Sequence, residues 1–312
     1  MHDEQTRTRP RRRAPALLAA VLLAAASCHD GAAPGGFDPA AADEVLFQEA
    51  VALYQAGDFA GARAKFEELL SGYPDSRRHD NAGYLAGRCR YALFDYAGAI
   101  ATFDELRRLH PASLFTDEAL YFTGRSRFHL ADYLAAAEDF RASLVADPAG
   151  TYADNADYYV GRCYYEAGDL VSAATELARF ETARPDSTYL DNARYYLGRA
   201  YFDRNEFASA VEPFQRVRLT AGSYYADDAT YYLGRSHYGL GDLGTALADF
   251  ERLLADYQTS QYLDNALYYE VRIGCDSGDC VSAAAALDEL RARFPLSLSI
   301  PPAQTYLATG GC

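Results

Sequence analysis

Residues 191–202 of the chain read DNARYYLGRAYF, and most of the remaining sequence consists of further copies of this stretch. The Asp that opens it has counterparts whose positions differ by 37, 37, 37, 36 and 37 residues. A fixed period of this size indicates stacked structural units, each too small to bury its apolar face alone. We therefore look for function on a surface formed by repetition. The counterparts are Asp80, Asp117, Asp154, Asp191, Asp227 and Asp264.

The repeat resembles the tetratricopeptide (TPR) repeat, whose pattern is Leu-Gly-x2-Tyr, later Ala-x3-Phe, then Pro. The copy quoted above supplies Leu197-Gly198 with Tyr201, and then Ala210 with Phe214. Seven copies of about 37 residues cover residues 43–299. The resemblance implies an all-α, right-handed superhelical solenoid of about seven helical hairpins. We expect residues 300–312 to fold back as a C-terminal cap.

Small and large side chains have separate places in this pattern. The Gly and the Ala should lie where the two helices of a hairpin cross closely, and the Phe should fill the space toward the next hairpin. Asp58 should cap the second helix of the first hairpin. Because a Ser such as Ser76 or Ser187 stands four residues before the repeat Asp, we expect it to cap a first helix lengthened by most of a turn.

The N-terminal residues 1–27 have the composition of a signal peptide. Five arginines precede the apolar run 14–26, which is too short to span a bilayer. The sequence Ala25-Ala26-Ser27-Cys28 resembles a bacterial lipobox, and that resemblance implies cleavage before Cys28 and its acylation. Residues 28–42, rich in Gly, Ala and Pro, are then a flexible tether. The alternative is a secretory signal cut nearby, which would leave a soluble periplasmic protein.

Net charge and motif content exclude several classes of function. The chain carries −15 overall, and the +3 of residues 1–27 leaves −18 for residues 28–312, which argues against a general nucleic-acid binder. No catalytic constellation, cofactor motif or set of metal ligands stands out against the repeat. We therefore expect neither an enzyme nor a cofactor, metal or small-molecule substrate.

The segment Pro-Asp-Ser-x-x-x-Asp-Asn-Ala-x-Tyr, at 74–84 and 185–195, is similar to one branch of the tetratricopeptide family. This branch contains the BamD-type outer-membrane lipoproteins, which help to assemble β-barrels, and the repeat region of the periplasmic Tol–Pal coordinators. The resemblance implies a lipid-anchored scaffold that faces the periplasm and binds protein or peptide partners, in an outer-membrane assembly or secretion complex. A cell-division coordinator of the Tol–Pal type is the alternative. His29, rather than Asp, follows Cys28, which favours the outer membrane.

One stripe of side chains, spaced i, i+3, i+7 and i+10, recurs on the first helix of each hairpin; in the fifth copy its last member is Phe202. In tetratricopeptide arrays this stripe lines the groove that binds peptides, and Tyr, Arg and Asn suit an extended, acidic segment. The alternative is structural: the Arg residues would pair with the repeat Asp of neighbouring hairpins while the Tyr rings stack on them. The groove candidates are Tyr121, Arg125, Asn155, Tyr158, Arg162, Asn192, Tyr195, Arg199, Tyr231, Arg235, Tyr268 and Arg272.

The cysteines suggest one disulfide. Cys275 and Cys280 flank a turn in the last copy, and an exported protein meets oxidising conditions, so a bridge between them would staple the final hairpin. Cys312, at the chain end, is the alternative partner. Cys89 and Cys163 occupy equivalent positions two hairpins apart, beyond disulfide reach, and should be buried.

Overall fold

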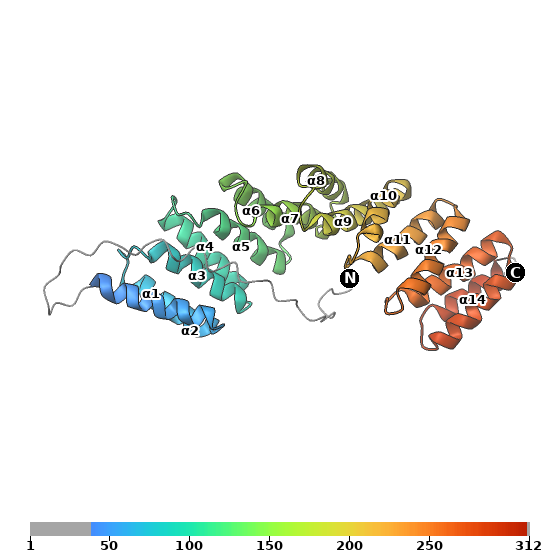
Figure 1. Cartoon of the computed structure of the whole chain (residues 1–312), viewed down its shortest axis with the longest axis horizontal. Coiled ribbons are helices and arrows are strands. Elements are labelled where there is room, and N and C mark those ends of the chain that lie inside the picture. Colours follow the sequence, from blue (N-terminus) through green and yellow to red (C-terminus); the bar gives the residue numbers. More distant parts are fainter. Residues whose placement is uncertain (1–38, 311–312) are drawn as a thin grey trace. The chain divides into compact units, whose positions relative to one another are not determined.

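The computed structural model describes residues 39–310, and all regular secondary structure in that range is helical (Figure 1). The helices are α1 (Pro39–Gln55), α2 (Phe59–Gly72), α3 (His79–Ala92), α4 (Tyr96–Leu109), α5 (Thr116–His129), α6 (Tyr133–Ala146), α7 (Ala153–Glu166), α8 (Leu170–Ala183), α9 (Leu190–Asp203), α10 (Phe207–Leu219), α11 (Ala226–Gly239), α12 (Leu243–Asp256), α13 (Leu263–Ser277), α14 (Cys280–Arg293) and α15 (Ile300–Thr309).

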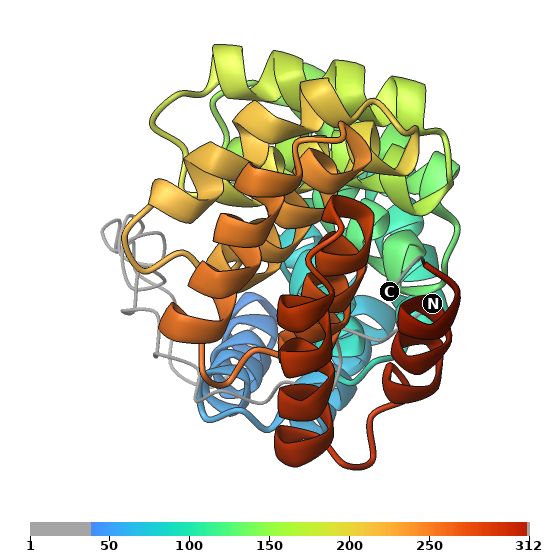
Figure 2. The same ribbon diagram turned by 90° about the vertical axis from the view of Figure 1, so that its right-hand side faces the viewer.

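Each helix packs against the next along the chain, so α1–α14 form seven hairpins; in the first, Phe47 of α1 meets Phe66 of α2, with ring centroids 5.9 Å apart. Contacts between α3 and α5, α7 and α9, and α9 and α11 join the first helices of successive hairpins. Helix α15 packs on α13 and α14. Figure 2 shows this end of the series from the front, with the last hairpin and α15 in dark red. The fold is the all-α tetratricopeptide solenoid that the repeat predicted.

Helix α1 begins four residues before the predicted boundary at Asp43. Pro39 opens the helix, where its missing N–H costs nothing and its fixed φ angle suits the first turn. The three alanines that follow are the best helix formers. The segment assigned to the tether is therefore helical from Pro39 onward.

The turn inside each hairpin contains one residue in the left-handed region, followed by the helix cap. Gly57, Gly168, Gly241 and Gly278 adopt this conformation readily, whereas Phe94, Ala131 and Asn205 hold φ near +60° at the equivalent position. In five of the seven hairpins an Asp then caps the second helix: Asp58 accepts a hydrogen bond from the Gly61 amide at 2.9 Å, as predicted. The same bond recurs at Asp95, Asp169, Asp242 and Asp279.

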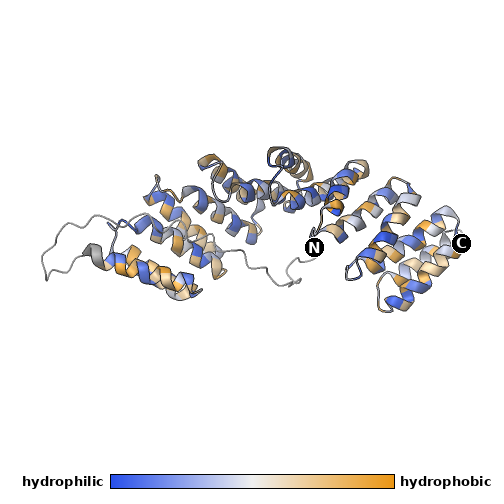
Figure 3. Ribbon diagram, viewed as in Figure 1, coloured by the Kyte–Doolittle hydropathy of each residue, from blue (hydrophilic) through white to orange (hydrophobic). Residues whose placement is uncertain are grey.

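The Gly and Phe of the repeat meet within the second, third, fifth and sixth hairpins, and Leu177 takes the place of the Phe in the fourth. A Cβ atom on Gly198 would lie 2.7 Å from Cε1 of Phe214, so only glycine fits under that ring. Phe214 is fully buried and stacks on Tyr232 of the next hairpin, with ring centroids 5.5 Å apart. Both predicted packing roles are confirmed. Figure 3 shows the resulting alternation of apolar and polar positions along the helices.

The three residues beyond the usual repeat length lie in the loop between hairpins, and the prediction of a longer first helix is wrong. Helices α3 and α4 both have 14 residues, and residues 110–115 connect α4 to α5. Ser76 lies two residues before the N-cap residue, Arg78, and its Oγ accepts a hydrogen bond from the Arg78 amide at 3.1 Å. The serine thus orders the loop instead of capping the helix. The repeat Asp does occupy the first turn, as expected.

Candidate functional site

The predicted stripe lies along the first helices of the hairpins, and its tyrosines are buried except Tyr268, which is half-buried. Tyr121 and Tyr158 are each 2% exposed, and Tyr231 is 6% exposed. Burial raises the pKa of Tyr158 and Tyr231 far above the ordinary value, while the neighbouring arginines oppose the shift. These hydroxyls are therefore protonated at neutral pH and are available as hydrogen-bond partners.

Each stripe tyrosine except Tyr268 stacks on a ring that immediately precedes the first helix of the next hairpin. The interplanar angles are between 6° and 25°, as expected for stacked rings. These contacts join consecutive hairpins. The pairs and their centroid distances are Tyr84–Phe115 (4.8 Å), Tyr121–Tyr152 (4.4 Å), Tyr158–Tyr189 (5.3 Å), Tyr195–Tyr225 (4.2 Å) and Tyr231–Tyr262 (4.2 Å).

Each stripe arginine lies over a different ring of the next hairpin, 33 or 34 residues further along the chain. Hydrogen bonds to the tyrosine on its own helix fix its position, for example Arg88 to the Tyr84 hydroxyl at 2.7 Å. The distances from Cζ to the ring centroid are 4.1 Å for Arg88–Phe122, 4.7 Å for Arg125–Tyr159, 3.9 Å for Arg162–Tyr196, 4.4 Å for Arg199–Tyr232, 5.9 Å for Arg235–Tyr269 and 4.9 Å for Arg272–Tyr306.

The stripe asparagines also join hairpins. Nδ2 of Asn155 donates to the Tyr121 hydroxyl at 3.2 Å and to the Tyr189 hydroxyl at 2.8 Å. Asn192 donates to Tyr225 at 3.4 Å. The side chains that the sequence selected as groove candidates are therefore, in large part, contacts between neighbouring repeats.

At Asp80 and Asp264 the structural alternative, in which the stripe arginines pair with the repeat aspartates, is not what the structure shows. Asp80 and Asp264 instead accept hydrogen bonds from Ser113, at 3.0 Å, and Ser297, at 2.6 Å, in the loop of the following hairpin. These carboxylates lie in the first turn of their helix, beside the loop, whereas the arginines lie two turns further on. The aspartates and the stripe arginines are thus separated along the helix axis.

The guanidinium groups are only partly covered. Arg125 and Arg235 are half-buried, and no carboxylate among residues 39–310 lies within ion-pair distance of either. Their buried Nε atoms have no hydrogen-bond partner within the same range. Arg162 differs, since its Nε donates to Glu166 at 2.7 Å. A row of partly exposed positive charges thus crosses an acidic body.

The sequence analysis did not predict the aromatic rings that lie under the stripe arginines. It also did not predict the arginine–ring contacts at the two ends of the hairpin series. The signal was available, because an aromatic residue directly follows the stripe tyrosine in five copies, as in Tyr121-Phe122. In the first hairpin Arg78 lies over Phe47 at 5.0 Å and pairs with Glu44 at 2.8 Å. At the other end Tyr306 of α15 covers Arg272.

The disulfide predicted between Cys275 and Cys280 is wrong. Cys275 is a free thiol, 5% exposed, packed in the core that α13, α14 and α15 share. Its side chain belongs to the buried face of α13. Cys280 does form a disulfide, and its partner is none of the other described cysteines, which are all free thiols. The alternative partner, Cys312, and the predicted acylation site, Cys28, lie outside the described residues.

Two further searches concern the described part of the chain alone. Between residues 39 and 310 no group of three or more His, Cys, Asp or Glu side chains is arranged to hold a metal ion. No helix in that range has the length and apolar character needed to cross a bilayer. The buried cysteines Cys89 and Cys163 are free thiols, as expected.

The hairpin series and its inter-repeat contacts define a tetratricopeptide solenoid. The family model described as "YfiO: Outer membrane lipoprotein" matches residues 39–131 and 115–268, which together span most of the chain. The protein belongs to this outer membrane lipoprotein family. No curated protein matches the chain.

Several solved structures share the fold. The C-terminal part of a TPR repeat-containing protein from Cytophaga hutchinsonii is 19% identical, with a TM-score of 0.68 over 82% of this chain and 98% of that one. A tetratricopeptide repeat protein from Parabacteroides merdae is 13% identical, with a TM-score of 0.55 over 86% and 100%. PilF from Pseudomonas aeruginosa is 18% identical, with a TM-score of 0.51 over 72% and 96%. At these identities the likeness concerns the fold alone.

Proposed function

We propose that the protein is a non-enzymatic scaffold of the outer membrane, anchored through acylated Cys28 and facing the periplasm. Its partners are proteins of an outer-membrane assembly or secretion complex. The match of residues 39–268 to the outer membrane lipoprotein family carries this proposal. A tetratricopeptide solenoid suits the role, because its repeated helices present a long surface of side chains to a partner.

The row of stripe arginines is the surface that we assign to partner binding. The tyrosines and asparagines hold the arginines in place, and the uncovered edges of the guanidinium groups provide the contact. Arg125 and Arg235 have no compensating carboxylate among residues 39–310, so the carboxylates of an acidic peptide segment would pair with the exposed edges of their guanidinium groups. Positive charge on an otherwise acidic body also selects for such a segment.

Metabolic labelling with palmitate tests the anchor. The native protein should incorporate label and fractionate with the outer membrane, and the Cys28→Ser variant should lose both properties. An unlabelled native protein would refute the anchored form of the proposal.

Replacing arginine by methionine separates binding from stacking. Methionine keeps a flexible chain over the ring and removes the charge. The double variant Arg125→Met and Arg235→Met should fold with nearly native stability and recover less partner from detergent-solubilised membranes. Arg108→Met, an exposed arginine on α4 away from the row, is the matched control. Recovery of outer-membrane assembly proteins supports the proposal, whereas recovery of cell-wall synthases favours the Tol–Pal type of coordinator. Unchanged recovery by the double variant would remove the arginine row from the binding surface.

A further inference from the structure

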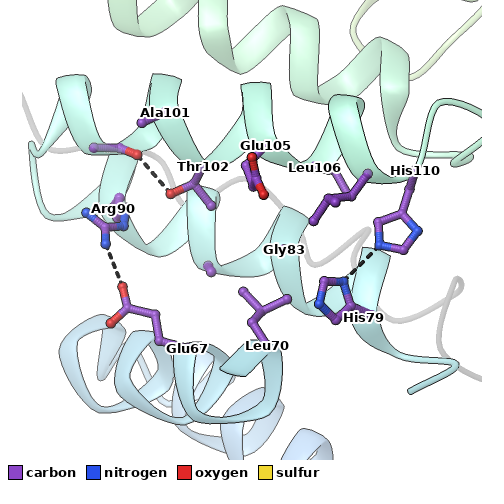
Figure 4. A pocket seen from close by; sticks show the side chains of 13 residues that line it. Glu67, Leu70, His79, Gly83, Arg90, Ala101, Thr102, Glu105, Leu106 and His110 are labelled. Atoms are coloured by element: carbon purple, nitrogen blue, oxygen red, sulfur yellow. Dashed lines mark hydrogen bonds and ion pairs between the residues drawn. The ribbon is translucent and has the colours of Figure 1, made fainter. Parts of the chain in front are cut away.

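A cavity of about 290 Å³ opens on the second hairpin, between α2 and α4, with α3 as its floor (Figure 4). Leu70 of α2, Gly83 of α3 and Leu106 of α4 lie around its centre. Arg90 and Glu67 lie at one end, and His79 and His110 lie at the other. None of these residues belongs to the stripe described above.

The cavity exists because residue 83 has no side chain. The equivalent positions on the first helices of the following hairpins are Leu120, Asp157, Arg194, Thr230 and Leu267. Leu120, Thr230 and Leu267 are buried there, so the corresponding space is filled by the chain itself. The second hairpin alone among these six has a glycine at this place.

Packing does not require the glycine. A Cβ atom on Gly83 would lie 3.5 Å from Cδ1 and 3.7 Å from Cβ of Leu106, which are ordinary van der Waals distances. Its φ angle is not in the left-handed region. Gly87, one turn further along α3, has no such freedom, because a Cβ there would collide with the Phe103 ring. Since glycine is a poor residue for a helix interior, Gly83 has a cost without a packing benefit.

The lining determines what the cavity accepts. Its walls are apolar, with Leu70, Ala86, Leu106 and Leu109 contributing. Most polar groups at its ends already bond to their neighbours. Arg90 donates to Glu67 at 2.7 Å and to Asp95 at 2.9 Å, and only its buried Nε has no partner among residues 39–310.

The histidine end is closed in the same way. His79 Nδ1 and His110 Nε2 share a hydrogen bond of 2.8 Å. The cavity therefore offers apolar contact area in its centre and few groups that need a polar ligand.

We propose that this cavity receives one bulky apolar side chain, of the size of Phe or Leu, from a partner protein. The volume is slightly below the usual range for small-molecule sites and suits a single aromatic or aliphatic group. The two carboxylates of the lining are already paired, Glu67 with Arg90 and Glu105 with Arg108, so apolar contact rather than charge selects what enters. The identity of the occupant as a protein rests on the proposed scaffold function, whereas the cavity's preference for an apolar side chain does not.

Methyl NMR on the purified chain tests the cavity with defined probes. N-acetyl-phenylalaninamide should produce saturable shifts of the Leu70 and Leu106 methyl signals, and N-acetyl-alaninamide should bind about tenfold more weakly or less. The variant Gly83→Leu fills the space with the side chain that Leu120 and Leu267 already place there, and it should abolish the shifts. Gly244→Leu, at a helical glycine with nothing within 4 Å of its Cβ, is the matched control and should leave them unchanged. No saturable shift, or equal shifts in Gly83→Leu, would overturn the assignment.

A photo-cross-linking residue at Leu109, on the exposed rim, identifies the occupant in cells. A protein adduct that disappears in the Gly83→Leu background supports the proposal. An adduct with lipid alone, or a protein adduct that Gly83→Leu leaves intact, overturns it. Because the NMR experiment does not depend on Cys28 or on the arginine row, its outcome is separate from that of the proposed function.

Discussion

Two glycines on the same face of α3 should respond in opposite directions to the same substitution. Gly83→Ala and Gly87→Ala both replace glycine in a helix interior, which favours the helix by about 1 kcal/mol in each case. At Gly83 the new methyl group meets Leu106 at 3.5 Å, so this gain is retained. At Gly87 it would lie 2.7 Å from Cζ and 2.8 Å from Cδ1 of Phe103, a fully buried ring. Overpacking of this kind costs about 1–3 kcal/mol.

We therefore expect Gly83→Ala to raise the free energy of unfolding by about 1 kcal/mol and Gly87→Ala to lower it by up to about 2 kcal/mol. Urea denaturation followed by circular dichroism measures both. Hydrogen exchange of the α3 and α4 amides locates the change, because a solenoid need not unfold as one cooperative unit. The comparison is internally controlled, since both substitutions restrict the unfolded chain equally. Shifts of the same sign and size would refute the packing argument.

Three further predictions concern single sites. Phe94 holds φ at +62°, a conformation that asparagine adopts more easily and that Asn205 adopts in an equivalent turn. Phe94→Asn should therefore raise the free energy of unfolding, measured by urea denaturation, by about 0.5–1 kcal/mol. An unchanged denaturation midpoint would contradict the strain argument. Burial, with Glu251 and Glu289 nearby, raises the pKa of Glu270 to about 7. The native protein therefore binds more protons than the unfolded chain between about pH 4.5 and 7. As a result, the free energy of unfolding falls as the pH rises through that window. Glu270→Leu should abolish this dependence and add at most about 3 kcal/mol at pH 8, and equal unfolding midpoints for both proteins at pH 5 and at pH 8 would contradict it. Non-reducing peptide mapping should link peptide 273–291 to peptide 294–312, with the link lost in Cys280→Ser and kept in Cys275→Ser. A bridge within peptide 273–291, with no link to 294–312, would instead restore the Cys275–Cys280 assignment.

The sequence was sufficient for the fold because the decisive contacts are local and repeated. Gly198 contacts Phe214, which is only 16 residues away, and every copy of the repeat contains the same pair of residues or a close variant. The loop chemistry was harder to predict. A serine before a helix can cap that helix or organise the turn that precedes it, and the two arrangements differ by two residues in backbone register. Ser76 makes the second arrangement, which moved the extra length of the repeat from the helix to the loop.

The role of the stripe depends on contacts between hairpins, which one repeat cannot specify. Helical spacing places Tyr195 and Arg199 on one face of α9, but it does not reveal whether that face is open or covered by α11. The structure shows that Tyr195 stacks on Tyr225, and that Arg199 lies over Tyr232. A groove and a stack require the same residue types, because flat rings and guanidinium groups suit both. The pattern alone therefore left the two alternatives open.

The first hairpin distinguishes these alternatives, since it loses a cation and a ring together. Val51 stands where the later hairpins have arginine, and the residue 34 positions further on, where they have an aromatic ring, is Leu85. Both side chains contribute to the apolar core of that hairpin. If the arginines existed only to bind a partner, nothing would require the ring to disappear with the charge. The joint change is what a stacking contact demands, because a ring without its cation or a cation without its ring forfeits the interaction. Stacking accordingly fixes where each arginine lies, and a binding partner can use only the edges that stacking leaves exposed.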